Sequence, residues 1–560
     1  MKNVFRLIVI GLIVTLAVPS MAGVATAQDG KKVLVTAYGV GDPHSIDPQL
    51  GIDTRDITLV TQLFPGLTWL NEVTRDVELA MAGSYDVSED GAVYTFHLLE
   101  DVPWVRYNDD SGEVEPIMGE DGNPRYVTAG DFVFGWTRAL DPATASPGAY
   151  MLAPYIVGAT EFNAGEGSAE DLGFQALDDY TLEVTGPEAV GYVLGIYGLG
   201  LARPIPAWAL EESGDVWTEP ENIASYGPFA LKAWSHEESI TYVKNPFWPG
   251  SDGIGQAELD ELMIRFMDNP VQLREYEAGN MDAIFVPISE LDRIRADSTL
   301  NAELSIVPGL CSQAWGFNTQ KAPFDNVHIR RAFSYAVDRQ SLVDYVTKGG
   351  EIPARWYTPP SISMAPTLED NPDLGIEYDP DIAQQELALG LEELGLDSAD
   401  DLPSITVVFG NTETLSLTAQ ALQVMWEETL DVRVELSGLD TTTYWSTLEE
   451  DAGQIFRAGW CPDYNDANNY LRDVMRSDSI YNYGRWQSDE FDQLVDEARL
   501  LSDPDKRRAL YAEAEQLMVV EEAGTMPLYW PITAMLTKPY VSRTYSTTGF
   551  EAYWKWDITE

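Results

Sequence analysis

The sequence predicts an α/β protein built from several domains, and three observations lead to this class. The chain has 560 residues, whereas one domain typically has roughly 100–200. Strand-like and helix-like hydrophobic periodicities alternate along it. No fixed-period repeat, heptad array or low-complexity tract is found beyond the N-terminal segment. Such alternation is typical of α/β lobes whose sheets contain parallel strands.

The N-terminal segment has the pattern of a cleaved secretory signal peptide. Lys2 and Arg6 precede an apolar run from Leu7 to Val18, and Ala25-Thr26-Ala27 supplies the small residues of a cleavage site. We therefore expect residues 1–27 to be removed. An uncleaved anchor is the alternative, but the run of about 12 residues is shorter than the roughly 20 needed to span a bilayer. No cysteine for a lipid anchor lies near this site, so we expect an extracytoplasmic protein.

An acidic segment from Asn108 to Gly122 could be a calcium loop or a solvated insertion. It carries six acidic residues among several glycines, namely Asp109, Asp110, Glu113, Glu115, Glu120 and Asp121. Their spacing does not match the calcium loop of an EF-hand. We therefore expect a solvated loop on the surface.

The clearest helix is predicted after Pro323-Phe324-Asp325. Apolar residues recur there at positions i, i+3, i+4, i+7 and i+8, which are Ile329, Ala332, Phe333, Ala336 and Val337. This spacing places them on one face of a helix. The pattern predicts a helix that packs that face on a core.

A βαβ unit is predicted between Ile405 and Leu436. An apolar run at 405–409 precedes a helical pattern at 415–430, and a second apolar run follows at 432–436. Two short apolar runs joined by a helix are typical of neighbouring parallel strands. The segment therefore predicts a partly parallel sheet in this part of the chain.

The charge balance excludes one class of partner. Asp and Glu number 91 against 34 Lys and Arg, which gives a net charge of −57. A surface this acidic repels phosphate backbones and anionic membranes. We expect no nucleic-acid partner.

Motifs for catalysis or for a cofactor are missing from the sequence. There is no H-E-x-x-H, no phosphate-binding G-x-x-x-x-G-K-[ST] and no G-x-S-x-G. The four histidines are scattered, and two cysteines are too few for an all-cysteine zinc or iron–sulfur site. A carboxylate pair of the glycosidase kind is the one enzymatic arrangement left open. We expect no catalytic residue, no metal and no cofactor.

The two cysteines lie in unusual surroundings. In a secreted chain, two lone cysteines more often pair than stay free. Cys461 lies in a segment that brings Arg457, Trp460 and Asp463 together beside Gly459. Glycine permits the close approach of another backbone. A ligand with an ammonium group at one end and a backbone to pair with would suit such a strand.

Short motifs that resemble one protein family run through nearly the whole mature chain. They are Ile46-Asp47-Pro48, Leu63-Phe64-Pro65-Gly66-Leu67, Tyr94-Thr95-Phe96-His97-Leu98, Val127-Thr128-Ala129-Gly130-Asp131-Phe132-Val133, Ala176-Leu177-Asp178-Asp179, Tyr226-Gly227-Pro228-Phe229, Lys244-Asn245-Pro246, Gly279-Asn280-Met281-Asp282, Phe317-Asn318, Pro323-Phe324-Asp325, Arg330-Arg331-Ala332, Asp338-Arg339 and Gly459-Trp460-Cys461-Pro462-Asp463-Tyr464. In this order and spacing, the chain resembles the family 5 solute-binding proteins of ABC importers, and among them the oligopeptide-binding members.

The resemblance implies a two-lobed periplasmic-binding-protein fold, the class II Venus flytrap, with an extra inserted domain. Domain I would comprise residues 28–72, 205–309 and 531–560. Domain II, at 73–204, would be inserted within it, and domain III, at 310–530, would form the second lobe. The implied protein is a monomer that works with the permease subunits of an ABC transporter.

The resemblance also implies roles for individual residues. Cys311 and Cys461 would form a disulfide, and Asp463 would bind the α-ammonium group of a peptide. The strands around Gly459 to Cys461 and near Ile52, Asp53 and Thr54 would pair with the peptide backbone. Trp460 would wall a side-chain pocket, and Arg457 would meet the C-terminal carboxylate of some peptides.

Three functional hypotheses follow. The first is a non-catalytic receptor that captures short peptides between two closing lobes and delivers them to a membrane permease. The second is an oligosaccharide receptor of the same fold, since the faces of tryptophan rings suit sugars. The third is a secreted glycosidase or peptidase. A requirement for a free α-ammonium group separates the first hypothesis from the second, and turnover of the ligand would identify the third.

Overall fold

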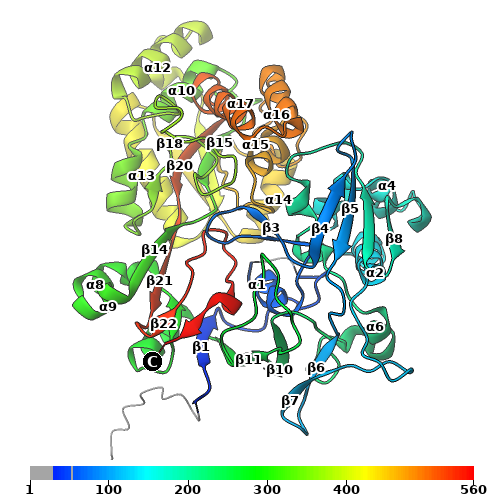
Figure 1. The fold of residues 1–560 in the computed structure, drawn as a ribbon. Coiled ribbons are helices and arrows are strands. Elements are labelled where there is room, and N and C mark those ends of the chain that lie inside the picture. Colours follow the sequence, from blue (N-terminus) through cyan, green and yellow to red (C-terminus); the bar gives the residue numbers. More distant parts are fainter. Residues whose placement is uncertain (1–29, 52–53, 560) are drawn as a thin grey trace, which may run out of the picture.

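The computed structural model describes residues 30–51 and 54–559, which form two lobes joined by strands (Figure 1). The first lobe contains the elements from β1 to β14 and the chain from β21 to the C-terminus. The second lobe contains the elements from β15 to β20. The predicted signal peptide, Ile52 and Asp53 lie outside the described residues.

One sheet of the first lobe is built from strands far apart in the sequence. Its strands, in spatial order, are β1 (Val33–Tyr38), β12 (Glu261–Phe266), β11 (Ser239–Lys244) and β10 (Phe229–Ser235). β1 and β12 are parallel, and the other neighbours are antiparallel. The helices of this part are α1 (Thr54–Leu63), α6 (Ala207–Ser213), α7 (Asn269–Glu277), α8 (Leu291–Ala296) and α9 (Ser298–Glu303).

A second sheet of the first lobe is antiparallel throughout. Its strands, in spatial order, are β4 (Ala82–Val87), β5 (Val93–Leu98), β9 (Thr181–Thr185) and β8 (Phe174–Asp178). Its helices are α2 (Ala129–Leu140), α3 (Ala149–Leu152), α4 (Ala159–Asn163) and α5 (Val193–Ile196). Strands β2 (Thr68–Leu70) and β3 (Val77–Leu79) pair next to it.

The acidic segment after Asn108 forms a β-hairpin, which differs from the loop that we expected. Strands β6 (Val105–Asn108) and β7 (Glu113–Pro116) pair antiparallel. The turn is held by Glu115, whose carboxylate accepts hydrogen bonds from Asn108 at 2.9 Å and Ser111 at 2.7 Å. Side chains that hold a turn explain why the segment is ordered.

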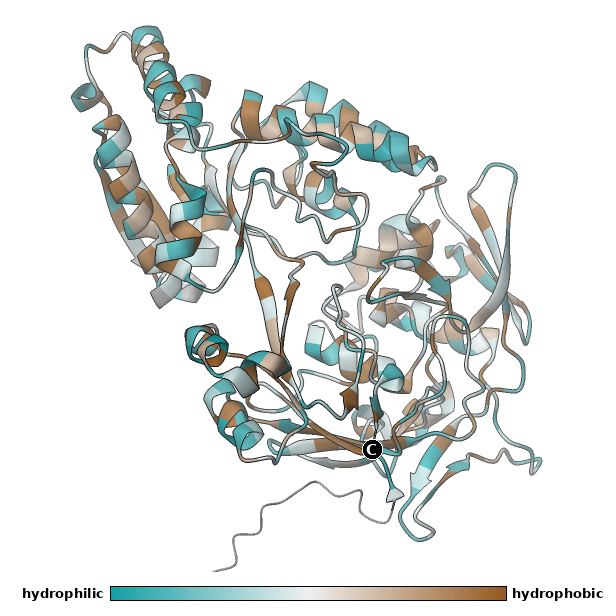
Figure 2. Ribbon diagram, turned by 60° about the vertical axis from the view of Figure 1, so that its left-hand side comes forward, coloured by the Kyte–Doolittle hydropathy of each residue, from teal (hydrophilic) through white to brown (hydrophobic). Residues whose placement is uncertain are grey.

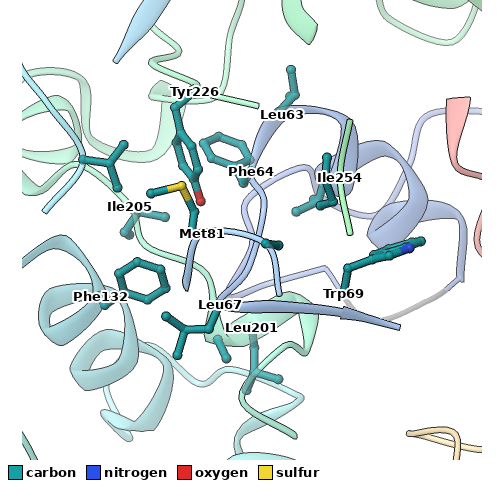
Figure 3. Packing of buried hydrophobic residues seen from close by; sticks show 14 of the residues in the cluster. Leu63, Phe64, Leu67, Trp69, Met81, Phe132, Leu201, Ile205, Tyr226 and Ile254 are labelled. Atoms are coloured by element: carbon teal, nitrogen blue, oxygen red, sulfur yellow. The ribbon is translucent and has the colours of Figure 1, made fainter. Parts of the chain in front are cut away.

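Both sheets of the first lobe share one hydrophobic core. Figure 3 shows its centre, where the rings of Phe64, Phe132 and Tyr226 lie close to Met81. These four residues are 0% exposed. Met81 and Phe132 belong to the residues predicted as domain II, and Phe64 and Tyr226 belong to predicted domain I. Burial of apolar surface stabilises by about 25 cal/mol per Å², so the packing of these side chains holds the two parts of the lobe together. The domain boundaries themselves remain a prediction.

The sheet of the second lobe is mixed and has six strands. In spatial order they are β16 (Ile352–Pro353), β20 (Thr525–Trp530), β15 (Gln313–Phe317), β19 (Ile455–Arg457), β17 (Ile405–Gly410) and β18 (Val434–Leu439). β17 and β18 are parallel and are joined by helix α13 (Glu413–Leu430), which confirms the predicted βαβ unit.

Helices cover this sheet (Figure 1). They are α10 (Val327–Tyr335), α11 (Arg339–Ser341), α12 (Pro380–Leu394), α14 (Thr441–Asp451), α15 (Ala467–Met475), α16 (Asp489–Leu500) and α17 (Pro504–Gln516). α10 confirms the predicted helix, which ends before Ala336 and Val337, and all five expected core residues are fully buried. In Figure 2, hydrophilic and hydrophobic residues alternate around these helices, as expected for helices with one buried face.

Two chain crossings connect the lobes. A three-stranded sheet, in the order β13 (Ala283–Phe285), β21 (Ile532–Thr537) and β14 (Leu304–Pro308), belongs to the first lobe. β14 continues into β15, and β20 continues into β21. At the crossing, the Gly309 amide donates to the Pro531 carbonyl at 2.8 Å. Two adjacent crossings of this kind are suited to act as a hinge. The C-terminal strands are β22 (Val541–Ser542) and β23 (Asp557–Ile558).

The observed α/β architecture confirms the predicted class. Within residues 30–51 and 54–559, no helix combines the length and the apolar character needed to cross a membrane.

Candidate ligand-binding site between the lobes

A cavity with about 1090 Å³ of empty space, part of it open to solvent, lies between the two lobes. Gly51, Ile57, Trp69, Tyr192 and Leu199 line it from the first lobe. The second lobe contributes Ser363, Met364, Asp463, Tyr464, Asp466 and Arg507. Its walls therefore come from both lobes, and of the predicted site residues it contains Asp463.

Asp463 is held in a defined orientation just before helix α15. Its backbone amide donates to the side-chain oxygen of Asn469 at 3.0 Å, and one carboxylate oxygen accepts from the Asn469 amide at 3.1 Å. Asp466, and not Asp463, caps α15, because its side chain accepts from the Asn468 backbone. Asp463 itself therefore does not cap this helix.

Asn469 connects several polar groups at this site. It is 1% exposed. Its oxygen also accepts from the Trp460 indole at 2.8 Å, and its amide also donates to Asp473 at 3.3 Å. A buried side-chain amide whose N–H groups and oxygen all form hydrogen bonds fixes the orientation of the side chains that it contacts. Asn469 therefore orients Asp463 and Trp460 together, which sequence reasoning missed because an asparagine in a helix carries no signal of this role.

The Asp463 carboxylate lies in surroundings that suit a cationic ligand. Burial raises its pKa above the usual range, and hydrogen bonds from Asn469 and Tyr150 partly oppose this rise. Among the described residues, no Lys, Arg or His forms an ion pair with it. A partly buried carboxylate without a cation gains from a ligand that supplies one.

The chain segment before Asp463 is fixed by the predicted cysteine pair. Cys311 and Cys461 form a disulfide, as the resemblance implies. Next to it, Ser312 and Trp460 exchange two backbone hydrogen bonds, of 2.8 and 3.2 Å. In an antiparallel pair, alternate residues direct their backbone groups to opposite sides. The N–H and C=O of Gly459 therefore point away from Ser312, which leaves them placed for another chain.

Gly459 also has to be glycine. A Cβ atom at this position would lie 2.6 Å from the Ser312 carbonyl oxygen and 2.7 Å from the Arg457 guanidinium. The first contact is with backbone and cannot be relieved by a side-chain rotation. The close pairing of this segment with Ser312 therefore requires glycine.

Arg457 and Trp460 line a second cavity, which lies within the second lobe. The Arg457 guanidinium donates to the Gln313 side-chain oxygen at 3.3 and 3.1 Å. The Trp460 ring contacts the Tyr481 ring, with centroids 4.9 Å apart. The structure thus brings Arg457, Gly459, Trp460 and Asp463 together along one segment.

Thr54 differs from its predicted place on a ligand-pairing strand. It is the first residue of helix α1 and is exposed. A helical residue cannot form a strand ladder, because its backbone turns every 3.6 residues. Ile52 and Asp53, predicted beside it, lie outside the described residues. Gly51 and Ile57, on either side of this segment, line the cavity between the lobes.

Aromatic side chains make contacts across the two lobes. The rings of Tyr192, from the first lobe, and Tyr464, from the second, are stacked with centroids 5.5 Å apart. The Arg507 guanidinium lies 4.9 Å from the Tyr192 centroid and is paired with Asp466. Tyr150, on α3, lies close enough to Asp463 to lower its pKa. No local sequence pattern could have indicated the contacts between the lobes, because the two partners in each of them are hundreds of residues apart.

The described part of the chain contains no group of three or more His, Cys, Asp or Glu side chains placed to hold a metal ion. The acidic hairpin at β6 and β7 belongs to this part.

Comparisons with known proteins agree on one family. Residues 76–482 match the model of bacterial extracellular solute-binding proteins, family 5. The oligopeptide-binding protein OppA of Bacillus subtilis is 31% identical over 546 residues, which cover 95% of this chain and 94% of that protein. The probable deoxycholate-binding periplasmic protein YgiS of Escherichia coli is 32% identical over 504 residues, with 89% and 88% covered.

The fold is also similar to that of a solved structure. The unliganded open form of the periplasmic murein tripeptide binding protein MppA superimposes with a TM-score of 0.79 at 24% identity, and 94% of this chain and 97% of that chain are covered. The two-lobed periplasmic-binding-protein fold is thereby confirmed. Members of the matched family are transport components and not enzymes. With more than half of its length matched by the family model, the chain belongs to the family 5 bacterial extracellular solute-binding proteins.

Proposed function

We propose that this protein captures short peptides between its lobes, anchors their free amino end on Asp463 and delivers them to the permease of an ABC importer. The observation that carries the proposal is the Asp463 carboxylate, which lines the cavity between the lobes and has no ion-pair partner among the described residues. An ammonium group bonded there forms a charge-assisted hydrogen bond, the stronger kind.

The neighbouring segment supports a peptide backbone as the rest of the ligand. The backbone groups of Gly459 face away from Ser312, so a ligand strand can pair with them. Pairing through the backbone gives affinity without reading the side chains. The oligopeptide-binding relative from Bacillus subtilis is consistent with this ligand class.

An anionic ligand fits the site less well. One relative is named as a probable deoxycholate-binding protein, and deoxycholate carries a carboxylate. An anion beside Asp463 would place two negative charges together, which costs free energy in a partly buried site. A sugar would leave the Asp463 charge unpaired. The peptide with a free amino end is therefore the ligand that the site favours.

Cellular location and assembly belong to the same proposal. The N-terminal pattern predicts export with removal of residues 1–27, and the family is extracellular. We expect the mature protein to act as a monomer outside the cytoplasm, with short peptides as ligands and the permease subunits as its protein partners.

Calorimetric titration of Asp463→Asn tests the anchor. Removing one partner of a desolvated charge pair costs about 2–5 kcal/mol, so binding of an unmodified tripeptide should weaken by roughly 30-fold or more. The variant keeps an oxygen for the Asn469 amide, so its melting temperature should change little. The N-acetylated tripeptide should already bind poorly to the wild-type protein.

Asp381→Asn is the matched control, because Asp381 is an exposed residue of α12 in the same lobe. It should leave the affinity unchanged. Equal affinities of wild-type and Asp463→Asn protein for the free and the acetylated peptide would remove Asp463 from the site. That result would favour an oligosaccharide as the ligand.

A further inference from the structure

Most of the wall of the cavity between the lobes has no role in the function proposed above, which uses only Asp463 from this cavity. The centres of water-sized molecules can occupy about 180 Å³ of it, and a single water molecule needs roughly 10–15 Å³. The cavity therefore has room for a large side chain.

The wall that the first lobe contributes is mainly apolar. Its apolar side chains come from segments far apart in the sequence and include Ile57, Trp69, Val77, Met151, Leu199 and Phe550. An apolar ligand group that binds against such a wall leaves water together with the side chains that it covers, which favours binding. A charged group loses its hydration there and regains little from apolar neighbours.

The charged side chains of the wall add a preference against cations. Asp466 is paired with Arg507, which donates to its carboxylate at 2.8 and 2.5 Å. Arg75 and Arg203 donate to backbone carbonyl groups, and neither forms an ion pair with a described carboxylate. Once a ligand ammonium group is bound to Asp463, the remaining charge of the wall is therefore positive. A lysine or arginine side chain of the ligand would meet this charge and would also lose its hydration.

The first side chain of the peptide is the one placed to enter the cavity. Asp463 lines the cavity, whereas Gly459 and Trp460 do not. A peptide backbone that pairs with Gly459 therefore runs away from the cavity after its amino end has met Asp463. The carbon atom that carries the α-ammonium group also carries the first side chain, so this side chain begins beside Asp463.

We infer that the cavity between the lobes binds the side chain of the first peptide residue and selects large apolar side chains there over charged ones. The inference rests on the proposed function, and it adds a preference that backbone pairing alone does not give. Asp463 fixes the amino end of every peptide in the same way. The apolar wall then decides which of these peptides bind most tightly.

Gly195 keeps part of this pocket open. It lies on helix α5, and apart from its own helix and chain neighbours, a Cβ atom at this position would come no closer than 3.9 Å to another atom, in the Val77 side chain. Both residues line the cavity. By contrast, a Cβ atom at Gly191 would lie 2.9 Å from the Leu501 carbonyl oxygen. Since helices also accept leucine better than glycine, Gly195→Leu is expected to fold and to fill part of the pocket.

Calorimetric titration with tripeptides tests this inference on the intact mature protein. The ligands are trialanine and its derivatives with phenylalanine, lysine or glutamate at the first position, all with free amino ends. Phenylalanine is expected to bind at least about tenfold more tightly than alanine or lysine, because full burial of a large apolar side chain changes affinity by at least about this factor. Glutamate should also bind less tightly than phenylalanine, since its carboxylate loses hydration.

The variant Gly195→Leu should remove most of this selectivity. The advantage of phenylalanine over alanine is expected to fall to about threefold or less, because the leucine side chain occupies space that the phenyl ring needs. Trialanine should bind within about twofold of its wild-type affinity, because its first side chain does not reach that space. Phenylalanine at the third position should bind equally well to the variant and to the wild-type protein.

Two further variants separate loss of the pocket from loss of the fold. Gly195→Ala adds one methyl group, so its effect on the phenylalanine peptide should be smaller than that of Gly195→Leu. Gly255→Leu is the matched control, because Gly255 does not line the cavity and a Cβ atom there would have no other atom within 4 Å. It should leave all affinities as in the wild-type protein. Melting temperatures of the same samples show which variants are folded.

The outcomes separate this inference from the proposed function. If trialanine binds only with a free amino end, but phenylalanine, lysine and glutamate at the first position bind equally, the pocket assignment is wrong and the proposed function stands. A preference for lysine or glutamate over phenylalanine also overturns the assignment, as does a phenylalanine advantage that is unchanged in folded Gly195→Leu and Gly195→Ala protein. If no peptide binds, the proposed function fails first.

Discussion

At the scale of single residues, Glu515 is a buried carboxylate that holds one wall of the cavity between the lobes. It lies near the end of α17 and is 0% exposed. Its two oxygens accept the backbone N–H groups of Tyr357 at 2.9 Å and Thr358 at 2.8 Å. The same chain segment continues to Ser363 and Met364, which line the cavity between the lobes. Burial raises the pKa of Glu515 to about 7.

We expect Glu515→Gln to flatten the dependence of stability on pH. The pKa of Glu515 is higher in the folded state than in the unfolded state. Between these two pKa values, the folded chain keeps the Glu515 proton that the unfolded chain has released. Stability from this group is therefore present at pH 4 to 5 and is lost as the pH rises to about 7. Melting temperatures measured between pH 5 and pH 8 should fall more steeply for the wild-type protein than for the variant. Over this range, the free energy of unfolding should fall by on the order of 1–3 kcal/mol more for the wild-type protein than for the variant.

Glu513→Gln provides the control, because Glu513 is exposed on the same helix. It should follow the wild-type curve. Parallel curves for the wild-type protein and Glu515→Gln would show that the Glu515 carboxyl does not titrate in this range.

At the scale of elements, the disulfide fixes the segment on which the proposed ligand contacts depend. Cys461 follows Trp460 and precedes Asp463 by two residues, while Cys311 lies two residues before the start of β15. The two cysteines are separated by 150 residues in the sequence. Closing a loop of about this length stabilises by roughly 5 kcal/mol in the chain-entropy model.

Replacing both cysteines by serine should therefore lower the melting temperature markedly, and it should also weaken peptide binding, because the segment from Gly459 to Asp463 loses one attachment. Scanning calorimetry with and without a saturating tripeptide measures both effects. In the wild-type protein, a maleimide added under denaturing, non-reducing conditions should find no free thiol. Two titrating thiols would contradict the pairing.

Elements with a strong local pattern could be predicted from the sequence, and contacts between distant elements could not. The helix at 327–335 and the βαβ unit at 405–439 follow from apolar residues that recur with fixed periods. The stack of Tyr192 on Tyr464 has no such signal, because it depends on how two lobes meet. Thr54 was expected on a strand, yet it begins α1. The family resemblance places a threonine at this position but does not predict its helical backbone conformation.

In the candidate site, too, the local motif could be predicted from the sequence and the tertiary contacts could not. The motif from Gly459 to Tyr464 predicts Asp463 as a ligand contact without any knowledge of its surroundings, because the motif lies within six consecutive residues. Asn469 and Tyr150, which contact Asp463, belong to a helix after the motif and to the opposite lobe. Residues that orient a functional group through tertiary contacts leave no mark in a single sequence.

At the scale of the whole molecule, the cavity that we propose as the binding site is divided between the two lobes. Gly51 and Ile57 line it from the first lobe, and Asp463 lines it from the second. The crossings at Gly309 and Pro531 are the points where the chain passes between the lobes. The two-lobed fold is the one shared with MppA. A ligand that touches both walls binds the closed arrangement better than the open one, and it therefore shifts the population toward closure.

We expect saturation with an unmodified tripeptide to reduce the radius of gyration measured by small-angle X-ray scattering. The reason is that the contacts with Asp463 and with the first-lobe wall can all form only when the cavity narrows. The N-acetylated peptide at the same concentration should leave the radius unchanged, because it lacks the ammonium group. The Asp463→Asn variant should need a correspondingly higher peptide concentration for the same compaction. Calorimetry on the same samples establishes saturation. A saturated wild-type protein whose radius of gyration does not change would show that binding occurs without closure, and the proposed capture between moving lobes would then be wrong.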